Sequence, residues 1–388
     1  MTNFSKYFFT FTFDLLSLRM RLEDLELTLT PGLGVKGVVH LLECFPTAEH
    51  VFQASESELR EVSKLRVQAI KSILERKGRR AAEREMEYCN KHNISILAST
   101  DSDYPTLLKE CNDYPHIIYV RGDKAALQQP MLSMVGTRDI SHYGERVCQY
   151  LIHDLAERIP NLTIVSGLAF GVDSACHRLA LEYGLKCVAV VANPLPDVTP
   201  VQHSNLAREI VESGGAIISE LPSSTHQNGM LYVARNRIIA GLSEGTIVIE
   251  SGASGGSLLT AGYADDYNRV VMATPGRIGD RSAIGTNALI RNRKAQMVLS
   301  AEDIIKELMW DVNLKEELQR PAPLLRVELT RDEAGLLNCF RSDDPLSMAE
   351  LEELSSLDHP TLTALLLSLE ISGEIRQLPG NRYEKLRR

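Results

Sequence analysis

The sequence lacks the residue patterns that mark most metal and nucleotide-cofactor sites. Its seven cysteines are scattered over 388 residues, without the CxxC spacing of a zinc or redox site. No GxGxxG follows the first predicted core strand, and neither a P-loop GxxxxGK[ST] nor HExxH is present. An odd, dispersed set of cysteines indicates a reduced, cytoplasmic protein. We therefore expect no metal and no cofactor.

The chain also lacks an excess of positive charge and a long apolar run. Its formal net charge is −9 and its isoelectric point about 5.7, so contact with nucleic acid requires a local basic patch. The apolar stretch at residues 7–13 is followed by Asp14 and is too short to span a bilayer. We expect residues 1–20 to be a disordered extension, and no membrane partner.

Residue patterns divide the remaining chain into three parts. Residues 21–92 are predicted to be helical, and the glycine turn at residues 29–34 suggests a helix-hairpin-helix (SAM-like) domain, although a plain helix–helix turn is the commoner explanation. Residues 93–310 alternate short apolar strands with helices, which predicts a Rossmann-like, doubly wound, mostly parallel α/β sheet. Residues 311–329 form a predicted linker. Residues 330–388 have three amphipathic helices and a terminal hairpin, which predicts a winged helix.

The stretch from Val233 to Ala261 is the most informative part of the core. It begins with Arg235-Asn236-Arg237, which we place in a turn, and continues through a buried strand at residues 246–249. It ends with Gly255-Gly256-Ser257 ahead of a helix, where free backbone N–H groups favour an anion. Ligands of doubly wound sheets bind beyond the carboxyl ends of the strands, so we predict a phosphate-binding crevice.

Two other strand ends supply candidates for the same crevice. Gly136-Thr137-Arg138 follows the first core strand, and the Arg138 guanidinium could form a forked contact with a phosphate. Ser166-Gly167 follows the next strand and precedes Asp173 and His177. These two side chains could pair one helical turn apart, and structural support is a commoner role for such a pair than catalysis.

Aromatic and acidic residues near the strand ends leave alternatives open. Tyr232 and Phe170 could stack on a base, with the buried core the commoner place for Phe170. Glu220 and Glu250 could each act as a general base, although a carboxylate that orders a neighbouring arginine is commoner. The sequence alone leaves these roles undecided.

Together these motifs resemble the DprA/Smf family of DNA-processing proteins. The resemblance rests on Gly136-Thr137-Arg138, SGLAFGVDSACH at 166–177, ARNRIIAGLS at 234–243, SGGSLLTA at 254–261, ATPG at 273–276 and GTNALI at 285–290. One departure lies at residues 193–197, where family members usually have a glycine-containing turn with a basic residue close by.

The resemblance implies a non-catalytic homodimer that binds single-stranded DNA, protects it and loads the RecA recombinase onto it during natural transformation. It implies DNA contacts at Gly136, Thr137, Arg138, Ser166, Gly167, His203, Arg235, Asn236, Arg237, Gly255, Gly256 and Ser257. The enzymatic alternative is a nucleoside-monophosphate phosphoribohydrolase, a related Rossmann-like group whose PGGxGTxxE signature is only begun at residues 275–280. An interaction scaffold with a vestigial crevice is a third possibility.

The predicted winged helix has little positive charge where DNA would be read. Its last helix, residues 361–371, contains no Lys or Arg. A DNA-reading helix normally has some. We therefore expect this domain to contact protein, or to add only weakly to DNA binding through Arg376 and Arg382.

Overall fold

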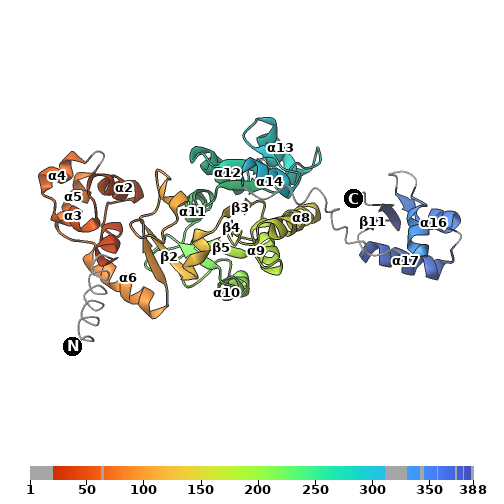
Figure 1. The fold of residues 1–388 in the computed structure, drawn as a ribbon, viewed down its shortest axis with the longest axis horizontal. Helices are drawn as coiled ribbons and strands as arrows, with labels where there is room; N and C mark the ends of the chain where they lie inside the picture. The colour runs from red at the N-terminus through yellow and green to blue at the C-terminus, as the bar shows by residue number, and fades with distance from the viewer. Residues whose placement is uncertain are drawn as a thin grey trace, which may run out of the picture. The chain divides into compact units, whose positions relative to one another are not determined.

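The chain forms two compact units, residues 1–312 and 313–388 (Figure 1). The computed structural model describes residues 21–62, 65–310, 330–340, 345–355, 357–371, 374–378 and 380–385. The predicted extension at residues 1–20 and the predicted linker at residues 311–329 lie outside the described residues.

A nine-stranded sheet organises the first unit. Its strand order is β1-β2-β6-β5-β4-β3-β7-β8-β9. Neighbours from β6 to β9 are parallel, whereas β1 pairs with β2, and β2 with β6, in antiparallel fashion. This confirms the predicted doubly wound, mostly parallel sheet. The strands are β1 (Ser95–Ala98), β2 (Ile117–Gly122), β3 (Met131–Val135), β4 (Thr163–Ser166), β5 (Lys186–Val190), β6 (Ala216–Ser219), β7 (Gly245–Val248), β8 (Val270–Ala273) and β9 (Gln296–Met297).

The strand order reverses at β3. After β3 the chain adds β4, β5 and β6 on one side, and then crosses over to add β7, β8 and β9 on the other. The last residues of β3 and β7, Val135 and Val248, are register partners. The segments that follow these two strands therefore emerge side by side, where doubly wound sheets form their binding crevice.

Helices cover both faces of the sheet, and β3 shows the alternation that this requires. Leu132 and Met134 belong to one apolar core, whereas Met131 and Val135 belong to the other. The first core receives α6 (Arg79–Lys91), α8 (His142–Arg158), α9 (Val172–Glu182), α10 (Ser204–Glu212) and α14 (Ala301–Glu307). The second receives α7 (Thr106–Lys109), α11 (Gly229–Leu242), α12 (Gly256–Asp266) and α13 (Ile284–Arg291). Short 3₁₀ turns are η1 (Lys124–Gln128), η2 (Val201–His203) and η3 (Arg281–Ala283).

The described residues from 21 up to β1 are mostly helical, as predicted. A helix at residues 21–28 precedes α2 (Val35–Cys44), α3 (Ala48–Gln53), α4 (Glu56–Glu61) and α5 (Val67–Leu74). These four helices gather in red to orange in Figure 1, with α6 leading toward β2. They have a small core of their own, but Leu25 and Cys89 belong to the core beneath the sheet. The Glu85 carboxylate of α6 also accepts the backbone N–H of Ser223 at 2.9 Å.

The second unit is a winged helix, as predicted. It consists of α15 (Arg331–Leu337), β10 (Leu346–Ser347), α16 (Met348–Ser355), α17 (His359–Ile371), β11 (Ile375–Leu378) and β12 (Arg382–Lys385), with strand order β10-β12-β11. Arg376 forms an ion pair with Glu384, and Arg382 donates to the Pro345 carbonyl at 2.8 Å. The proposed weak DNA contacts of these two arginines stay a prediction. Among the described residues of the chain, no helix combines the length and apolarity needed to cross a membrane.

Candidate functional site

A cleft of about 770 Å³ opens beyond the carboxyl ends of the central strands. Its walls come from residues 135–138 after β3, 167–173 after β4, 229–239 of α11 and 251–260 after β7. Most of the predicted site residues line it: Gly136, Thr137, Arg138, Gly167, Arg235, Asn236, Gly255, Gly256 and Ser257. Segments far apart in the sequence therefore meet at the point where the strand order reverses.

The loop after β3 is held by backbone contacts and leaves one arginine exposed. The Thr137 N–H donates to the Glu250 carbonyl at 2.8 Å, and the Thr137 carbonyl accepts from Val172 at 3.1 Å. Arg138 projects from this loop, with its guanidinium carbon 5.9 Å from the Tyr232 ring centroid. Within the described part of the chain it forms no ion pair. Its positive charge is therefore available to a ligand.

Arg235 lies within α11 and not in the turn that the sequence suggested. Its guanidinium is buried and donates from Nη1 to the carbonyls of Gly167, at 2.7 Å, and Val190. It thus joins the ends of β4 and β5 at the floor of the cleft. Burial lowers the pKa of this guanidinium, and the charge of Asp173 opposes that shift.

Asp173 lies at the floor of the cleft, and His177 is buried one helical turn further along α9. Burial raises the pKa of Asp173, and the charge of Arg235 opposes the rise. Burial, followed by electrostatic interactions with His203 and Arg235, lowers the pKa of His177 to about 3. Within the described residues Asp173 accepts the Ala169 N–H at 3.3 Å and has no hydrogen bond to His177. The proposed direct pairing is not seen.

The wall after β7 is the start of α12. Gly255 precedes the helix and offers no capping side chain, and the first turn contains no acidic residue. The first N–H groups of a helix have no intrahelical partner, so this end favours an anion. Asn236 ties the wall to α11 by donating to the Gly256 carbonyl at 3.4 Å, and Ser257 donates to the Ser251 hydroxyl at 2.9 Å.

Three predicted site residues make internal contacts and do not line the cleft. The Ser166 hydroxyl donates to the Met134 carbonyl at 2.6 Å. The His203 ring donates from Nδ1 to the Leu168 carbonyl at 2.8 Å and borders a neighbouring hollow. Arg237 is two residues beyond Arg235 on α11, so it faces another side of the helix and forms a buried ion pair with Glu220. DNA contacts by these three residues stay predictions.

The two carboxylates that could serve as general bases are both engaged. Burial raises the pKa of Glu220, and the charge of Arg237 opposes the rise. Glu220 thus fits the role of a carboxylate paired with a neighbouring arginine. Glu250 instead accepts from the Ser141 N–H at 2.9 Å, the Ser141 hydroxyl at 2.6 Å and the Ser282 hydroxyl at 3.1 Å.

Phe170 is not a core residue, contrary to the commoner expectation. It is 45% exposed and lines the cleft. Its ring packs edge-on against His203, with centroids 4.8 Å apart. Gly171, at φ +76°, follows it directly, and this glycine turn directs Phe170 outward. In the sequence, Gly167 and Gly171 on the predicted strand-to-helix turn are the signal that could have indicated an exposed Phe170.

The sequence reasoning also passed over Gly252-Ala253-Ser254-Gly255-Gly256, which fits the GxSxG pattern of serine hydrolases. Ser254 is exposed and outside the cleft lining. Within the described residues no hydrogen bond joins it to a histidine, whereas a serine nucleophile needs a base within reach. The match therefore supports no hydrolase assignment.

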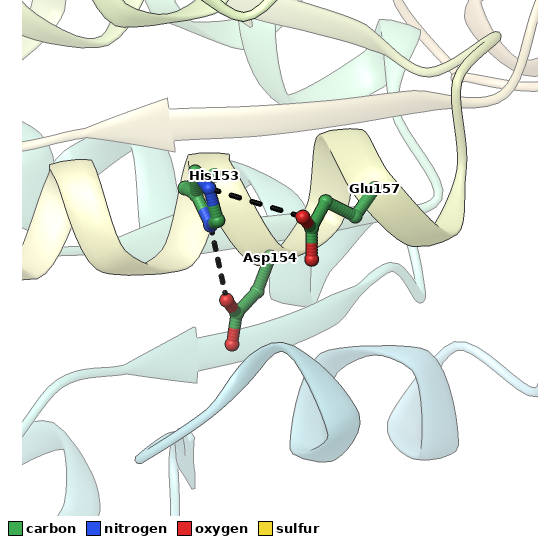
Figure 2. Close-up of side chains that lie close together, drawn as sticks. All are labelled: His153, Asp154 and Glu157. Atoms are coloured by element: carbon green, nitrogen blue, oxygen red, sulfur yellow. Dashed lines mark hydrogen bonds and ion pairs between the residues drawn. The ribbon is translucent and has the colours of Figure 1, made fainter. Parts of the chain in front are cut away.

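The described residues contain one cluster with the composition of a metal site, on the surface of α8. Figure 2 shows His153 between Asp154 and Glu157. Nδ1 lies 3.4 Å from the Asp154 carboxylate and Nε2 4.0 Å from that of Glu157. Each carboxylate therefore contacts a different ring nitrogen, as expected for ion pairs along a solvated helix face. We assign no metal to this cluster.

Comparison with known proteins agrees with this geometry. The family model described as DNA recombination-mediator protein A matches residues 95–309, more than half of the chain. The chain belongs to this family. A second model, the DprA winged helix domain, matches residues 320–381.

Individual relatives extend the match beyond the core. Protein Smf of Escherichia coli K12 is 31% identical over 323 residues, which cover 80% of this chain and 82% of that protein. DprA from Streptococcus pneumoniae matches in structure with a TM-score of 0.63 and 30% identity, covering 73% of this chain and 95% of that one. DNA processing protein A from Helicobacter pylori, described for its single-stranded DNA binding mode, matches with a TM-score of 0.50 and 26% identity. That match covers 57% of this chain and 98% of that one.

Proposed function

We propose that this protein binds single-stranded DNA without sequence preference in the cleft beyond β3 and β7, and performs no chemistry on it. The observation that supports this most is Arg138, an exposed guanidinium beside the Tyr232 ring that forms no ion pair with any residue the structure describes. A guanidinium can bind a backbone phosphate, and the ring can stack on any base.

The remaining wall suits a second phosphate. The uncapped start of α12, with Gly255 and Gly256, lines the same cleft as Arg138. Contacts to phosphates do not distinguish sequences. In a chain of net charge −9 this local arrangement is where a polyanion would bind, with an affinity that falls as salt rises.

The proposal that the protein performs no chemistry is supported by the two candidate general bases, whose carboxylates are already bound to other side chains. Glu220 is paired with Arg237, and Glu250 accepts three hydrogen bonds from two serines. Asp173 lines the cleft but lies against Gly167 and Arg235 at its floor. Unlike Glu220 and Glu250, Asp173 is among the residues that line the cleft. The enzymatic alternative, cleavage of a nucleoside monophosphate, would therefore depend on this carboxylate.

Two further parts of the proposal rest on family membership. We propose that the protein loads RecA recombinase onto the bound DNA during DNA uptake, and that it acts in the cytoplasm as a homodimer. The Helicobacter pylori relative, described for its binding to single-stranded DNA, supports the first step of that sequence. RecA loading is tested by following filament formation on an oligonucleotide with and without this protein.

The DNA-binding step is tested by titrating labelled oligo-dT at two salt concentrations. Wild type should bind, and its log affinity should fall with log salt by about 0.7 per phosphate contacted. Arg138→Ala should weaken binding roughly tenfold, as expected for loss of a charge-assisted contact. Arg138 is preferred over Arg235 for this test because the Arg235 guanidinium also holds the fold.

The matched control is Arg208→Ala. Arg208 is an exposed arginine of α10 paired with Glu212, so its removal changes net charge equally without touching the cleft. Equal affinities of wild type and Arg138→Ala would contradict the proposed site. Base release from a nucleoside monophosphate, abolished by Asp173→Asn, would favour the enzymatic alternative.

A further inference from the structure

A second hollow, of about 380 Å³, lies next to the cleft. The two share Arg138 and Phe170, so a ligand that leaves the cleft on this side passes between these residues. The second hollow is built by the loops after β3 and β4, Glu145 of α8, residues 174–178 of α9 and the turn η2. It contributes Arg178 and Gln202, which do not line the cleft.

Phe170 lines both hollows and is the aromatic residue at their common border, which we call the ridge. Its backbone is fixed on both sides: Leu168 has φ +56° and holds His203 through its carbonyl, while Gly171 has φ +76°. A Cβ added to Gly171 would lie 2.2 Å from the Thr137 carbonyl, so the loop packs directly onto the segment that bears Arg138. One edge of the Phe170 ring rests on His203 and 45% of the side chain is exposed. A fixed, exposed ring loses little freedom when a base stacks on it.

Arg178 is the cationic group beyond that ridge. It is an exposed residue of α9 and forms no ion pair within the described residues. The nearby Glu145 carboxylate lies 3.3 Å from the His142 ring, on the other wall of the hollow. An exposed guanidinium next to a stacking ring is the pairing that a single strand needs, one group for the phosphate and one for the base.

Charge also distinguishes the second hollow from a third one that adjoins the cleft. A third hollow, of about 600 Å³, shares Thr137 and Gly252 with the cleft and is lined by Asp139, Asp280 and Arg281. The second hollow is lined by two arginines and two carboxylates. The third therefore has a net negative lining and the second does not, so a phosphate backbone is favoured in the direction of Arg178.

We propose that the bound DNA strand continues from the cleft over Phe170, which stacks on a base, into the second hollow, where Arg178 binds a further backbone phosphate. This inference rests on the proposed function. It adds a second subsite to the binding track and assigns Phe170 and Arg178 to it.

The test is a length series of oligo-dT, titrated against wild type and Arg178→Ala, with Arg208→Ala as the charge-matched control. Arg178→Ala should bind the shortest oligonucleotides as wild type does. It should bind longer ones about fivefold to tenfold more weakly, and the slope of log affinity against log salt should become less negative by about 0.7. Equal losses at every length would place the Arg178 contact within the first cleft and overturn the second subsite.

Phe170 is tested in parallel by Phe170→Leu and Phe170→Tyr. Loss of stacking in the leucine variant should weaken binding of long oligonucleotides roughly fivefold or more, whereas the tyrosine variant should bind as wild type does. Oligonucleotides with 2-aminopurine should show fluorescence quenching at one position that the leucine variant removes.

The two proposals fail in different ways. If wild type binds no oligonucleotide, the proposed function itself is wrong. If wild type binds and Arg138→Ala weakens it, while Arg178→Ala and Phe170→Leu match Arg208→Ala at every length, only the second subsite is refuted. Tryptophan emission from Trp310, in the first unit, confirms that each variant is folded.

Discussion

Replacing Arg237 with alanine should destabilise the first unit without weakening DNA binding by the folded protein. The Arg237 and Glu220 side chains are only 9% and 13% exposed, and they form an ion pair. Removing one partner of a buried pair leaves the other charge unpaired, at a cost of about 3–5 kcal/mol. Since some exposure remains, we expect about 3 kcal/mol, or roughly 1 M urea for an m value near 3 kcal/mol per M.

The loss should depend on pH in a direction that the structure fixes. Burial raises the pKa of Glu220 above its ordinary 4.5, and the charge of Arg237 is the largest effect that opposes this rise. In Arg237→Ala the pKa of Glu220 should therefore rise further. A carboxyl with a raised folded-state pKa stabilises the fold fully below its unfolded pKa, and that contribution is lost as pH rises. The deficit relative to wild type should therefore be smaller at pH 5 than at pH 8.

Urea unfolding can be followed through the single tryptophan. Trp310 donates its indole N–H to Glu244 at 2.7 Å and packs on the core of the first unit, so its emission reports on that unit. Changing both partners, with Arg237→Met and Glu220→Met, should recover much of the loss because no charge is left buried. An unchanged unfolding midpoint in Arg237→Ala, or no recovery in the double variant, would refute the reasoning. An affinity loss as large as that of Arg138→Ala would show that Arg237 contacts DNA after all.

Two further predictions concern the floor of the cleft. The folded state keeps His177 unprotonated down to a pKa of about 3, so the free energy of unfolding should fall as pH decreases from about 6.5, by up to about 1.4 kcal/mol per pH unit from this residue. His177→Gln should flatten that dependence in urea titrations at pH 7, 6 and 5, and parallel curves would contradict the assignment. Gly167→Ala should cost about 1–3 kcal/mol, because the added Cβ would lie 2.6 Å from the Asp173 carboxylate and 2.7 Å from the Arg235 guanidinium. In Gly262→Ala the added Cβ meets nothing within 4 Å, so this control should be neutral or slightly stabilising in the same melts.

Local sequence pattern predicted most of the strands and the class of the sheet. Runs such as Thr163–Ser166 are short, apolar and followed by glycine, and these features are local. The reversal of strand order at β3 is not local, because it depends on which strands pair. The antiparallel addition of β1 and β2 beside β6 is likewise set by packing between distant segments.

The sequence predicts which residues line the cleft where their position along the chain decides this, and fails to do so where the direction of a side chain decides it. Arg138 and Gly255 follow strand ends, so the sheet alone places them at the crevice. Arg235 and Arg237 look equivalent in the sequence, but within α11 one lies at the cleft floor and the other pairs with Glu220. Phe170 is an apolar residue whose outward direction follows from the backbone of Gly171.

The shared core beneath the sheet limits how this chain can be divided or recombined. The family match begins at residue 95, yet Leu25, Ala82 and Cys89 pack against the same core as the strands that follow. A fragment starting there would keep β1 but expose the apolar surface that these side chains cover, and Ser223 would lose its Glu85 acceptor. Chimaeras between relatives joined at this boundary would therefore need matched side chains on both sides. We therefore expect the helices before β1 and the sheet of this protein to evolve together.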